Sequence, residues 1–96
     1  MSTYHHLVLF KIHDTVAQSD MDRAVALLAD LGEGHAGIEE WKVNSSIDTR
    51  KGRIIIEEAV FSSVEDYQRF KVSDSHVVVG DFMKTIADWW VGDYEA

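Results

Sequence analysis

Cysteine is absent from this sequence of 96 residues. Its absence excludes disulfide bonds, thiolate metal ligands and a cysteine nucleophile. Long apolar runs are absent as well, since nothing approaches the roughly 20 apolar residues that a membrane-spanning helix needs. The short apolar run at residues 7–10 is flanked by charged residues and histidines, so we expect no signal peptide. We therefore expect a cytoplasmic protein that has no membrane partner.

Positive charge is scarce. The 9 lysines and arginines stand against 17 aspartates and glutamates, which gives a formal net charge of −8. Nucleic acids are bound by lysine and arginine side chains that neutralise phosphates, and this sequence has no basic cluster for that role. We expect no nucleic-acid partner and no binding to anionic membranes.

Length and composition predict one folded domain that covers residues 1–96. A chain of this size buries roughly two thirds of the surface that it exposes when unfolded. The hydrophobic fraction of 46% is ordinary for a folded protein and too high for a disordered one.

Alternating side chains predict four strands, at Tyr4–Ile12 and at residues 38–44, 53–61 and 89–94. Helical spacing of apolar residues predicts a helix from Ser19 to residue 31, ended by Gly32. A second helical region is broken into a short helix that ends near residue 72 and a longer one over about 73–87. The order β-α-β-β-α-β predicts a ferredoxin-like α+β fold, a four-stranded antiparallel sheet with helices on one face.

Local motifs refine the second half of the chain. Residues 62–65 match the capping box S-x-x-E, with which a helix begins. Ser73 is the expected N-cap of the longer helix. Its predicted apolar stripe consists of Val77, Val78, Phe82, Met83 and Ile86. In the last strand, Gly92 is a possible bulge.

The first and third strands are apolar on both faces. Leu7 and Leu9 lie opposite Val8 and Phe10, and residues 54 and 56 are isoleucines opposite Ile55 and Ala59. The two helical regions can cover only one face of the sheet, and the other would expose a large apolar patch. We expect a two-fold homodimer with the sheets packed face to face; scattered surface isoleucine and leucine is the alternative.

Two histidines are the candidate catalytic residues. His76 falls in the first turn of the longer helix, where the helix dipole favours a neutral imidazole that can act as a base. His6 faces the helices if Val8 and Phe10 do, and it could share a pocket with His76. The alternative is that both are core histidines whose hydrogen bonds are satisfied within the protein.

Glu57 shares a strand face with Ile55 and Ala59, whereas Glu58 points to the opposite side. A carboxylate in apolar surroundings must pair with a cation, or its pKa rises. We expect Glu57 to lie near His6 or His76 and to tune the pKa of that histidine. A glutamate that reaches water from an edge strand is the alternative.

No metal site is expected. His5 and His6 are adjacent in a strand and point to opposite sides, so they cannot chelate one metal together. His13 and His35 show no ligand spacing with the acidic residues. The three tryptophans lack basic neighbours and are expected in the core and at an interface rather than as a stacking platform for nucleic acid.

Three stretches, HHLVLFKI, FSSVEDYQRFKVSDSH and the final GDY, resemble the stress-responsive A/B barrel domain (Dabb) family, and the resemblance covers almost the whole chain. It implies a dimeric α+β barrel. One enzymatic branch, similar to the plant olivetolic acid cyclase, closes a linear polyketide by aldol condensation. It uses no metal or organic cofactor, in a pocket between the helices and the sheet of each subunit.

The residues of that branch carry over in part. Its essential histidine falls on His76, its first-strand histidine on His6 and a further pocket histidine on Ile55. Its essential tyrosine falls on Phe70, which cannot donate a hydrogen bond to an enolate or alkoxide. Tyr67 lies about one turn earlier, a displacement of ~5 Å, and is the candidate substitute.

Together these observations predict a cofactor-independent enzyme or binding protein for a small, apolar or polyketide-like ligand. The expected catalytic residues are His76 and His6. The expected pocket residues are Val8, Phe10, Ile55, Glu57, Tyr67, Phe70 and Phe82. A non-catalytic stress-response dimer whose pocket is filled by side chains is one alternative. A haem-degrading or antibiotic-biosynthesis monooxygenase-like barrel is another; pocket volume and haem binding distinguish them.

Overall fold

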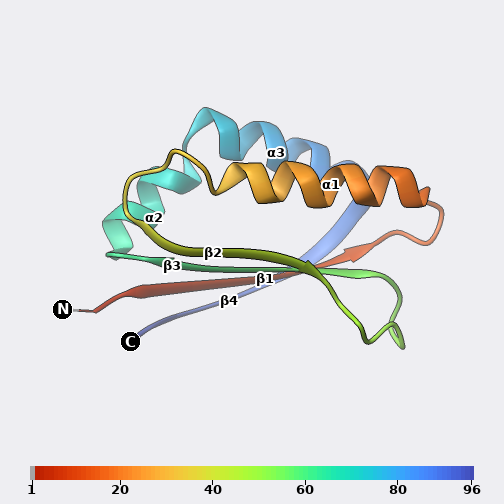
Figure 1. Cartoon of the computed structure of the whole chain (residues 1–96), viewed down its shortest axis with the longest axis horizontal. Coiled ribbons are helices and arrows are strands. Elements are labelled where there is room, and N and C mark those ends of the chain that lie inside the picture. Colours follow the sequence, from red (N-terminus) through yellow and green to blue (C-terminus); the bar gives the residue numbers. More distant parts are fainter. Residues whose placement is uncertain (1) are drawn as a thin grey trace.

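The computed structural model describes residues 2–96, in which a four-stranded antiparallel sheet carries three helices on one face (Figure 1). The strands stand in the order β2-β3-β1-β4. The fold is therefore the ferredoxin-like α+β fold that the sequence predicts. Its elements are β1 (Tyr4–Ile12), α1 (Gln18–Leu31), β2 (Ile38–Ser45), β3 (Ile54–Phe61), α2 (Val64–Lys71), α3 (Asp74–Ile86) and β4 (Ala87–Glu95).

Two helix starts differ from the prediction. Helix α1 begins one residue before Ser19, and Ala17, its N-cap, makes no side-chain capping bond. Helix α2 is capped by Ser63, not Ser62, and the Ser63 hydroxyl accepts a hydrogen bond from the Asp66 N–H. The Ser62 N–H donates instead to the carbonyl of Gly37. Ser62 thus fixes the loop before β2, which leaves the capping role to the next serine.

Helix α3 starts as predicted, because the Ser73 hydroxyl accepts a hydrogen bond from the backbone N–H of His76. The predicted apolar stripe is correct at Met83 and Ile86 but wrong at Val77 and Val78. Val77 and Val78 are exposed, whereas Val79, Met83 and Ile86 are buried. Positions 76, 79, 83 and 86 share one helix face, so the observed register turns His76 toward the sheet.

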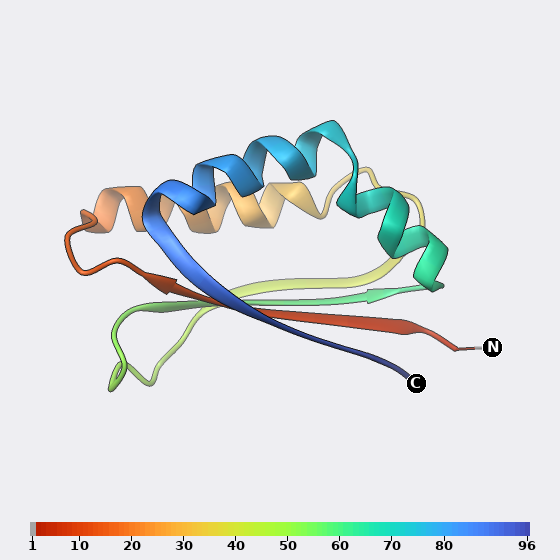
Figure 2. The ribbon, with the colours of Figure 1, turned by 180° about the vertical axis from the view of Figure 1, so that it is seen from behind.

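The last helix runs into the last strand without a loop, since α3 ends at Ile86 and β4 begins at Ala87 (Figure 2). Strand β4 pairs with β1 in an uninterrupted register, in which Gly92 lies opposite Leu7. The expected bulge at Gly92 is therefore absent from this strand pair. The same register places Asp93 directly opposite His6.

The core lies between the helices and the sheet, and its most deeply buried large side chains are Ile12, Leu28, Ile55, Phe61 and Met83. Trp41 on β2 donates a hydrogen bond from its indole N–H to the Leu28 carbonyl, 3.0 Å away. Gly32 ends α1 beneath this ring, and a Cβ there would lie 2.2 Å from Trp41 Cγ. Gly32 is required by this close approach, because its own φ is −72° and not left-handed.

The opposite face of the sheet is not covered by any helix of residues 2–96 (Figure 1). Strand alternation places on it the apolar side chains of Leu7, Leu9, Ile54, Ile56, Val60 and Trp90. Leu9 and Trp90, which are paired across β1 and β4, are 45% and 62% exposed. The two-faced strands predicted from the sequence are present, and we call this set of six side chains the open face.

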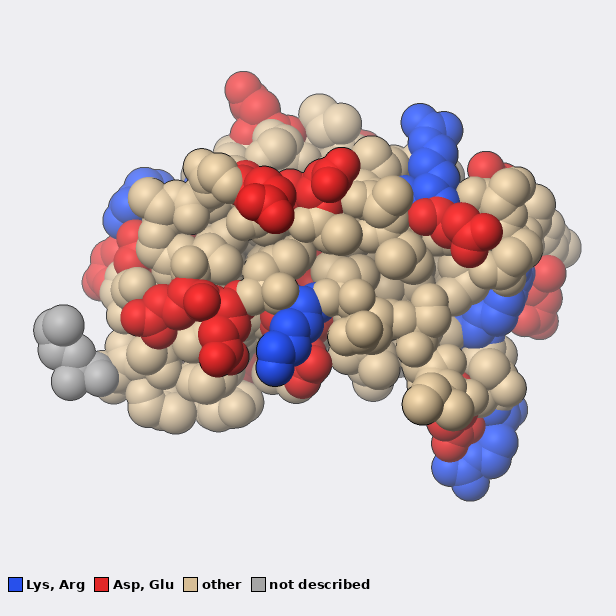
Figure 3. All heavy atoms as spheres, viewed as in Figure 1, with Lys and Arg blue, Asp and Glu red and all other residues tan. Residues whose placement is uncertain are grey.

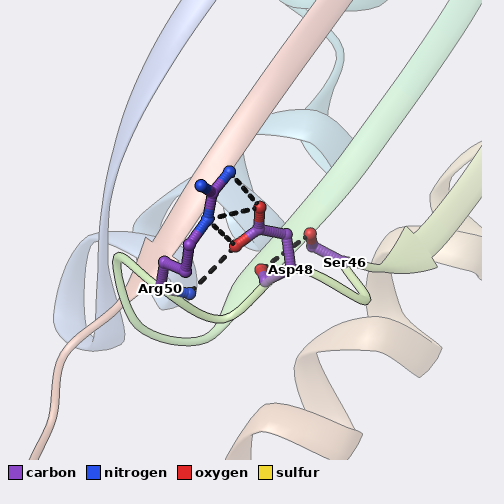
Figure 4. Close-up of polar contacts among 3 residues, drawn as sticks. All are labelled: Ser46, Asp48 and Arg50. Carbon is purple, nitrogen blue, oxygen red and sulfur yellow. Dashed lines mark hydrogen bonds and ion pairs between the residues drawn. The ribbon is translucent and has the colours of Figure 1, made fainter.

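The loop between β2 and β3 is organised by Asp48 (Figure 4). Its carboxylate accepts hydrogen bonds from the Arg50 guanidinium, the shortest 2.6 Å, and from the Arg50 backbone N–H. The Ser46 hydroxyl donates to the Asp48 carbonyl. The loop is exposed, and these contacts fix its shape and not a site.

Acidic side chains are spread over the face shown in Figure 3, and the basic ones among them do not form a continuous patch over the helices and sheet. None of the helices within residues 2–96 is long and apolar enough to cross a membrane.

Candidate functional site

A cavity of about 500 Å³ lies between the sheet and the helices. Its apolar wall includes Val8, Phe10, Leu28, Leu31, Val79 and Met83. Its polar groups are Tyr4, His6, Glu57, Tyr67, His76 and Asp93, with Lys71 also on the wall. A largely apolar cavity of this volume with a few converging polar groups is typical of a small-molecule site.

Gly80 contributes to the hollow. It lies on α3 beside Val79 and lines the cavity. A Cβ built on Gly80 would meet no atom within 4 Å. The missing side chain therefore leaves space that a ligand can occupy.

His6 lies between two carboxylates at one end of the cavity. Its Nδ1 is 2.7 Å from Asp93 Oδ1, and its Nε2 is 3.4 Å from Glu57 Oε2. The strand registers explain both contacts, because Asp93 is opposite His6 on β4 and Glu57 is opposite Val8, two residues along, on β3. Both ring nitrogens of His6 are therefore engaged within the protein.

Burial alone would lower the pKa of His6, but hydrogen bonding and charge from Glu57, followed by those of Asp93, outweigh it and raise the pKa. An imidazolium held in this way donates from both nitrogens. His6 is thus suited to hold carboxylates or donate a proton, and not to act as the base.

Tyr4 completes this end of the cavity. Its hydroxyl donates a 2.7 Å hydrogen bond to Asp93 Oδ2. This hydrogen bond, followed by burial and the Asp93 charge, raises the pKa of Tyr4 to about 12. Both oxygens of Asp93 are consequently occupied, one by His6 and one by Tyr4.

His76 is half-buried on α3, and its ring meets the edge of Phe70 at a centroid distance of 5.0 Å. Burial is the main cause that lowers the pKa of His76; the nearby Glu57 charge opposes it, and the His6 charge adds to it. A neutral ring is the expected state near pH 7, as the sequence predicts. Burial, which was not part of that prediction, is the main reason.

Tyr67 faces the same cavity from α2. Its ring stacks on Tyr4 at 4.6 Å and lies 4.9 Å from His6. Burial, followed by the charges of Asp93 and Glu57, raises the pKa of Tyr67 and keeps it a phenol. Within residues 2–96 its hydroxyl makes no hydrogen bond to protein, so it is free to donate to a ligand.

Six of the predicted site residues line the cavity: His6, Val8, Phe10, Glu57, Tyr67 and His76. Three do not. Ile55 is fully buried in the core, and Phe70 packs among Trp41, Phe61 and His76. Phe82 is half-buried beneath the Arg23 guanidinium, because the stripe of α3 that faces the sheet contains Met83 instead.

Tyr4, Asp93, Lys71 and Trp89 are among the lining residues that the sequence did not indicate. Alternation could have found Tyr4, which shares a strand face with His6 and Val8. Asp93 needed the register between β1 and β4, which residue spacing does not provide.

Metal-binding geometry is absent from the part of the chain that the structure describes, where no group of three or more histidine and acidic residues could hold an ion. The polar groups of the cavity can act directly on a ligand. A neutral imidazole can accept a proton, and a phenol hydroxyl can donate to an oxyanion. The apolar walls would exclude water from such a reaction.

Comparisons with known proteins agree with this architecture. The family model described as the stress responsive A/B barrel domain matches residues 4–96. No curated protein matches the sequence at a significant level.

The solved structures that are similar in fold include a bacterial protein of unknown function, a plant lyase and a bacterial oxygenase. A dimeric ferredoxin-like protein of unknown function from Bacteroides fragilis superposes with a TM-score of 0.82 at 18% identity, covering 98% of this chain and 96% of the other. The hydroxynitrile lyase from Passiflora edulis gives 0.82 at 21% identity, with 98% and 93% covered. The cofactor-independent oxygenase SnoaB from Streptomyces nogalater gives 0.82 at 14% identity, with 100% and 94% covered. At these identities the likeness concerns the fold alone.

Proposed function

Because the chain belongs to the stress responsive A/B barrel domain family, we propose that it is a small-molecule enzyme that works without a cofactor. Its substrate is a small, largely apolar carbonyl compound. One observation carries this proposal: the neutral His76 and Tyr67, whose hydroxyl makes no hydrogen bond within residues 2–96, face one cavity of about 500 Å³. This is a base and a donor in one apolar enclosure.

The proposed reaction begins with proton removal from the carbon next to the substrate carbonyl. His76 takes the proton, and the electrons of the broken C–H bond pass into the carbonyl group to form an enolate. Tyr67 donates a hydrogen bond to the enolate oxygen. In an aldol or cyclisation reaction, the enolate carbon then attacks a second carbonyl, and the imidazolium of His76 returns its proton to the alkoxide.

The cavity volume favours this reading over a non-catalytic dimer with a filled pocket, because about 500 Å³ is within the range of ligand sites. The printed names of two proteins with this fold, a hydroxynitrile lyase and a cofactor-independent oxygenase, support small-molecule chemistry in this architecture. A polyketide-like substrate is the finer proposal, and it depends on the resemblance of His76 and its surroundings to the cyclase branch.

The molecule is proposed to act as a homodimer through the open face. Its six apolar side chains are not covered by a helix of residues 2–96, and similar structures are described as dimeric. Burying roughly 400 Å² of apolar surface contributes about 10 kcal/mol before association costs. The cavity lies on the other side of the sheet, so each subunit would keep its own site.

Solvent exchange tests the chemistry without knowledge of the natural substrate. Benzylacetone is incubated with the protein in D₂O, and replacement of its α-protons by deuterium is followed by NMR. We expect exchange above the buffer rate, reduced about a hundredfold or more in His76→Gln and reduced in Tyr67→Phe. His13→Gln, at a histidine outside the cavity, is the matched control and should exchange as the wild type does.

Exchange at the buffer rate in the wild type would overturn the proposal. Haem titration and oxygen consumption, measured on the same samples, test the monooxygenase alternative. Haem binding or oxygen uptake without α-proton exchange would favour that alternative over enolate chemistry.

A further inference from the structure

Glu57 is the buried carboxylate of the cavity whose one donor among residues 2–96 is the His6 imidazole. It is 3% exposed and lines the cavity. Its nearest charged partner is His6, with 3.4 Å between Oε2 and Nε2. In residues 2–96 no hydroxyl or backbone N–H donates to this carboxylate, although a carboxylate can accept several hydrogen bonds.

Asp93 provides the contrast. Its two oxygens each have a partner at 2.7 Å, His6 Nδ1 on one side and the Tyr4 hydroxyl on the other. His6 is therefore held closely by Asp93 and only loosely by Glu57. The acceptor capacity that remains at this end of the cavity belongs to Glu57.

We propose that Glu57 accepts a hydrogen bond from a hydroxyl group of the ligand, so that the cavity selects a neutral phenol, enol or alcohol and rejects carboxylates. This inference rests on the proposed function in that it takes the same cavity as the ligand site. It specifies in addition which polar group the substrate carries and which residue binds that group.

The charges around the cavity argue for a neutral donor. Two carboxylates, Glu57 and Asp93, line the cavity together with His6, which contacts both of them and whose pKa is raised, and with Lys71. A ligand carboxylate would place a second negative charge beside Glu57 in surroundings that hold little water. A ligand ammonium would leave its hydration shell to enter a cavity whose wall already carries His6, with its raised pKa, and Lys71. A hydroxyl supplies a further donor and adds no charge.

Binding of three matched probes to the full chain tests this selectivity: para-pentylphenol, para-pentylbenzoate and para-pentylbenzylamine, measured by calorimetry at pH 7. We expect the phenol to bind at least about tenfold more tightly than the benzoate or the ammonium probe. Glu57→Gln should weaken phenol binding about tenfold. It should also reduce the ratio of the benzoate dissociation constant to the phenol dissociation constant. Glu58→Gln is the matched control, because Glu58 is the next residue and points to the opposite side of the sheet.

Equal binding of the three probes, tighter binding of the amine than the phenol, or the same effect from Glu57→Gln and Glu58→Gln would overturn the inference. Should Glu57→Gln fail to fold, Glu57→Asp keeps the charge at a shorter reach. Glu57→Asp should bind the phenol more weakly than the wild type does, while the benzoate remains the weaker ligand of the two. Unchanged phenol binding would again contradict the inference.

His76→Gln separates this inference from the proposed chemistry. It should still prefer the phenol over the benzoate, even where both affinities change because His76 lines the cavity, and yet lose α-proton exchange. Selective phenol binding without exchange in the wild type would remove the proposed reaction and leave the selectivity of Glu57 standing. Exchange without phenol preference would remove only the role of Glu57.

Discussion

Asp93 and His6 are paired across two neighbouring strands, with 2.7 Å between Oδ1 and Nδ1. They stand 87 residues apart in the chain. The pair couples the last strand to the charge state of the cavity. Removing either partner should therefore change stability and ionisation together.

Asp93→Asn should lower the pKa of His6. The negative charge of Asp93, which helps to offset the lowering effect of burial on this pKa, would then be absent. In the wild type the pKa of His6 is raised, so the folded state holds this proton more tightly than the unfolded state does. The resulting stabilisation is fully present below the unfolded-state pKa of about 6.5, and it is lost as the pH rises through the folded-state pKa.

Urea unfolding at a series of pH values between about 5 and 9 measures this effect. The loss of stability with rising pH should be smaller in Asp93→Asn than in the wild type. Tyr4 does not interfere, since its pKa of about 12 lies outside the range. Asp88→Asn, beside the more exposed His13, is the control; an equal response in both variants would contradict the assignment to His6.

Glu57→Gln should lower the pKa of both cavity histidines, since the Glu57 charge raises the pKa of His6 and of His76. For His76, whose pKa is already lowered, the stabilising effect of the neutral ring is present above the ordinary value of about 6.5 and is lost as the pH falls through the folded-state pKa. NMR titration of the histidine ring protons measures both values. Wild-type titration curves in Glu57→Gln would show that Glu57 does not tune these rings.

Gly80→Ala should stabilise the protein and impair its site. Alanine in a helix is favoured over glycine by roughly 0.5–1 kcal/mol, and the added Cβ has no atom within 4 Å to clash with. The methyl group would occupy part of the cavity that Gly80 lines. Urea unfolding should show the gain, and binding of para-pentylphenol should weaken.

Val78→Ala is the matched control for Gly80→Ala, because Val78 is exposed on the same helix. It also improves helix propensity but should leave phenol binding unchanged. If Gly80→Ala bound the phenol as the wild type does, the space beside Gly80 would not be part of the ligand site.

Leu9→Lys should separate the subunits of the proposed dimer and leave each one folded. Leu9 is 45% exposed and lies beside Trp90 on the open face. The introduced charge should therefore destabilise the dimer interface more than the fold of each subunit. Sedimentation should show a dissociation constant at least about thirtyfold higher than that of the wild type. Val78→Lys, on the helical side, should remain dimeric; a wild-type chain that stays a folded monomer would contradict the open face as an interface.

Strand alternation made most of the fold predictable. Strands β1 and β3 show their buried sides in the sequence, and both show in addition that their second sides are apolar. The three consecutive valines 77–79 did not reveal the buried face of α3, because each of them is equally apolar. Packing against the sheet selects Val79, and this tertiary choice overrides a local pattern.

The candidate site was predictable only where one strand carries the information. His6, Val8, Phe10 and Glu57 follow from alternation within β1 and β3, and all four line the cavity. Phe70 was expected there because it aligns with a tyrosine of the cyclase branch, but the short helix α2 directs Tyr67 into the cavity instead. Asp93 depends on the pairing of strands from opposite ends of the sequence, which no local pattern contains.

Helix α3 and strand β4 meet directly at Ile86 and Ala87. The position of the helix therefore determines which side chains of β4 face the cavity. Successive strand residues point to alternate sides, so one residue inserted at this junction would shift β4 by one position against β1 and turn its side chains to the other face. Asp93 would then lie opposite His5, outside the cavity, although His76 would not have moved. Two inserted residues would restore the face but place Val91 opposite His6, so the His6–Asp93 pair requires the junction at its present length.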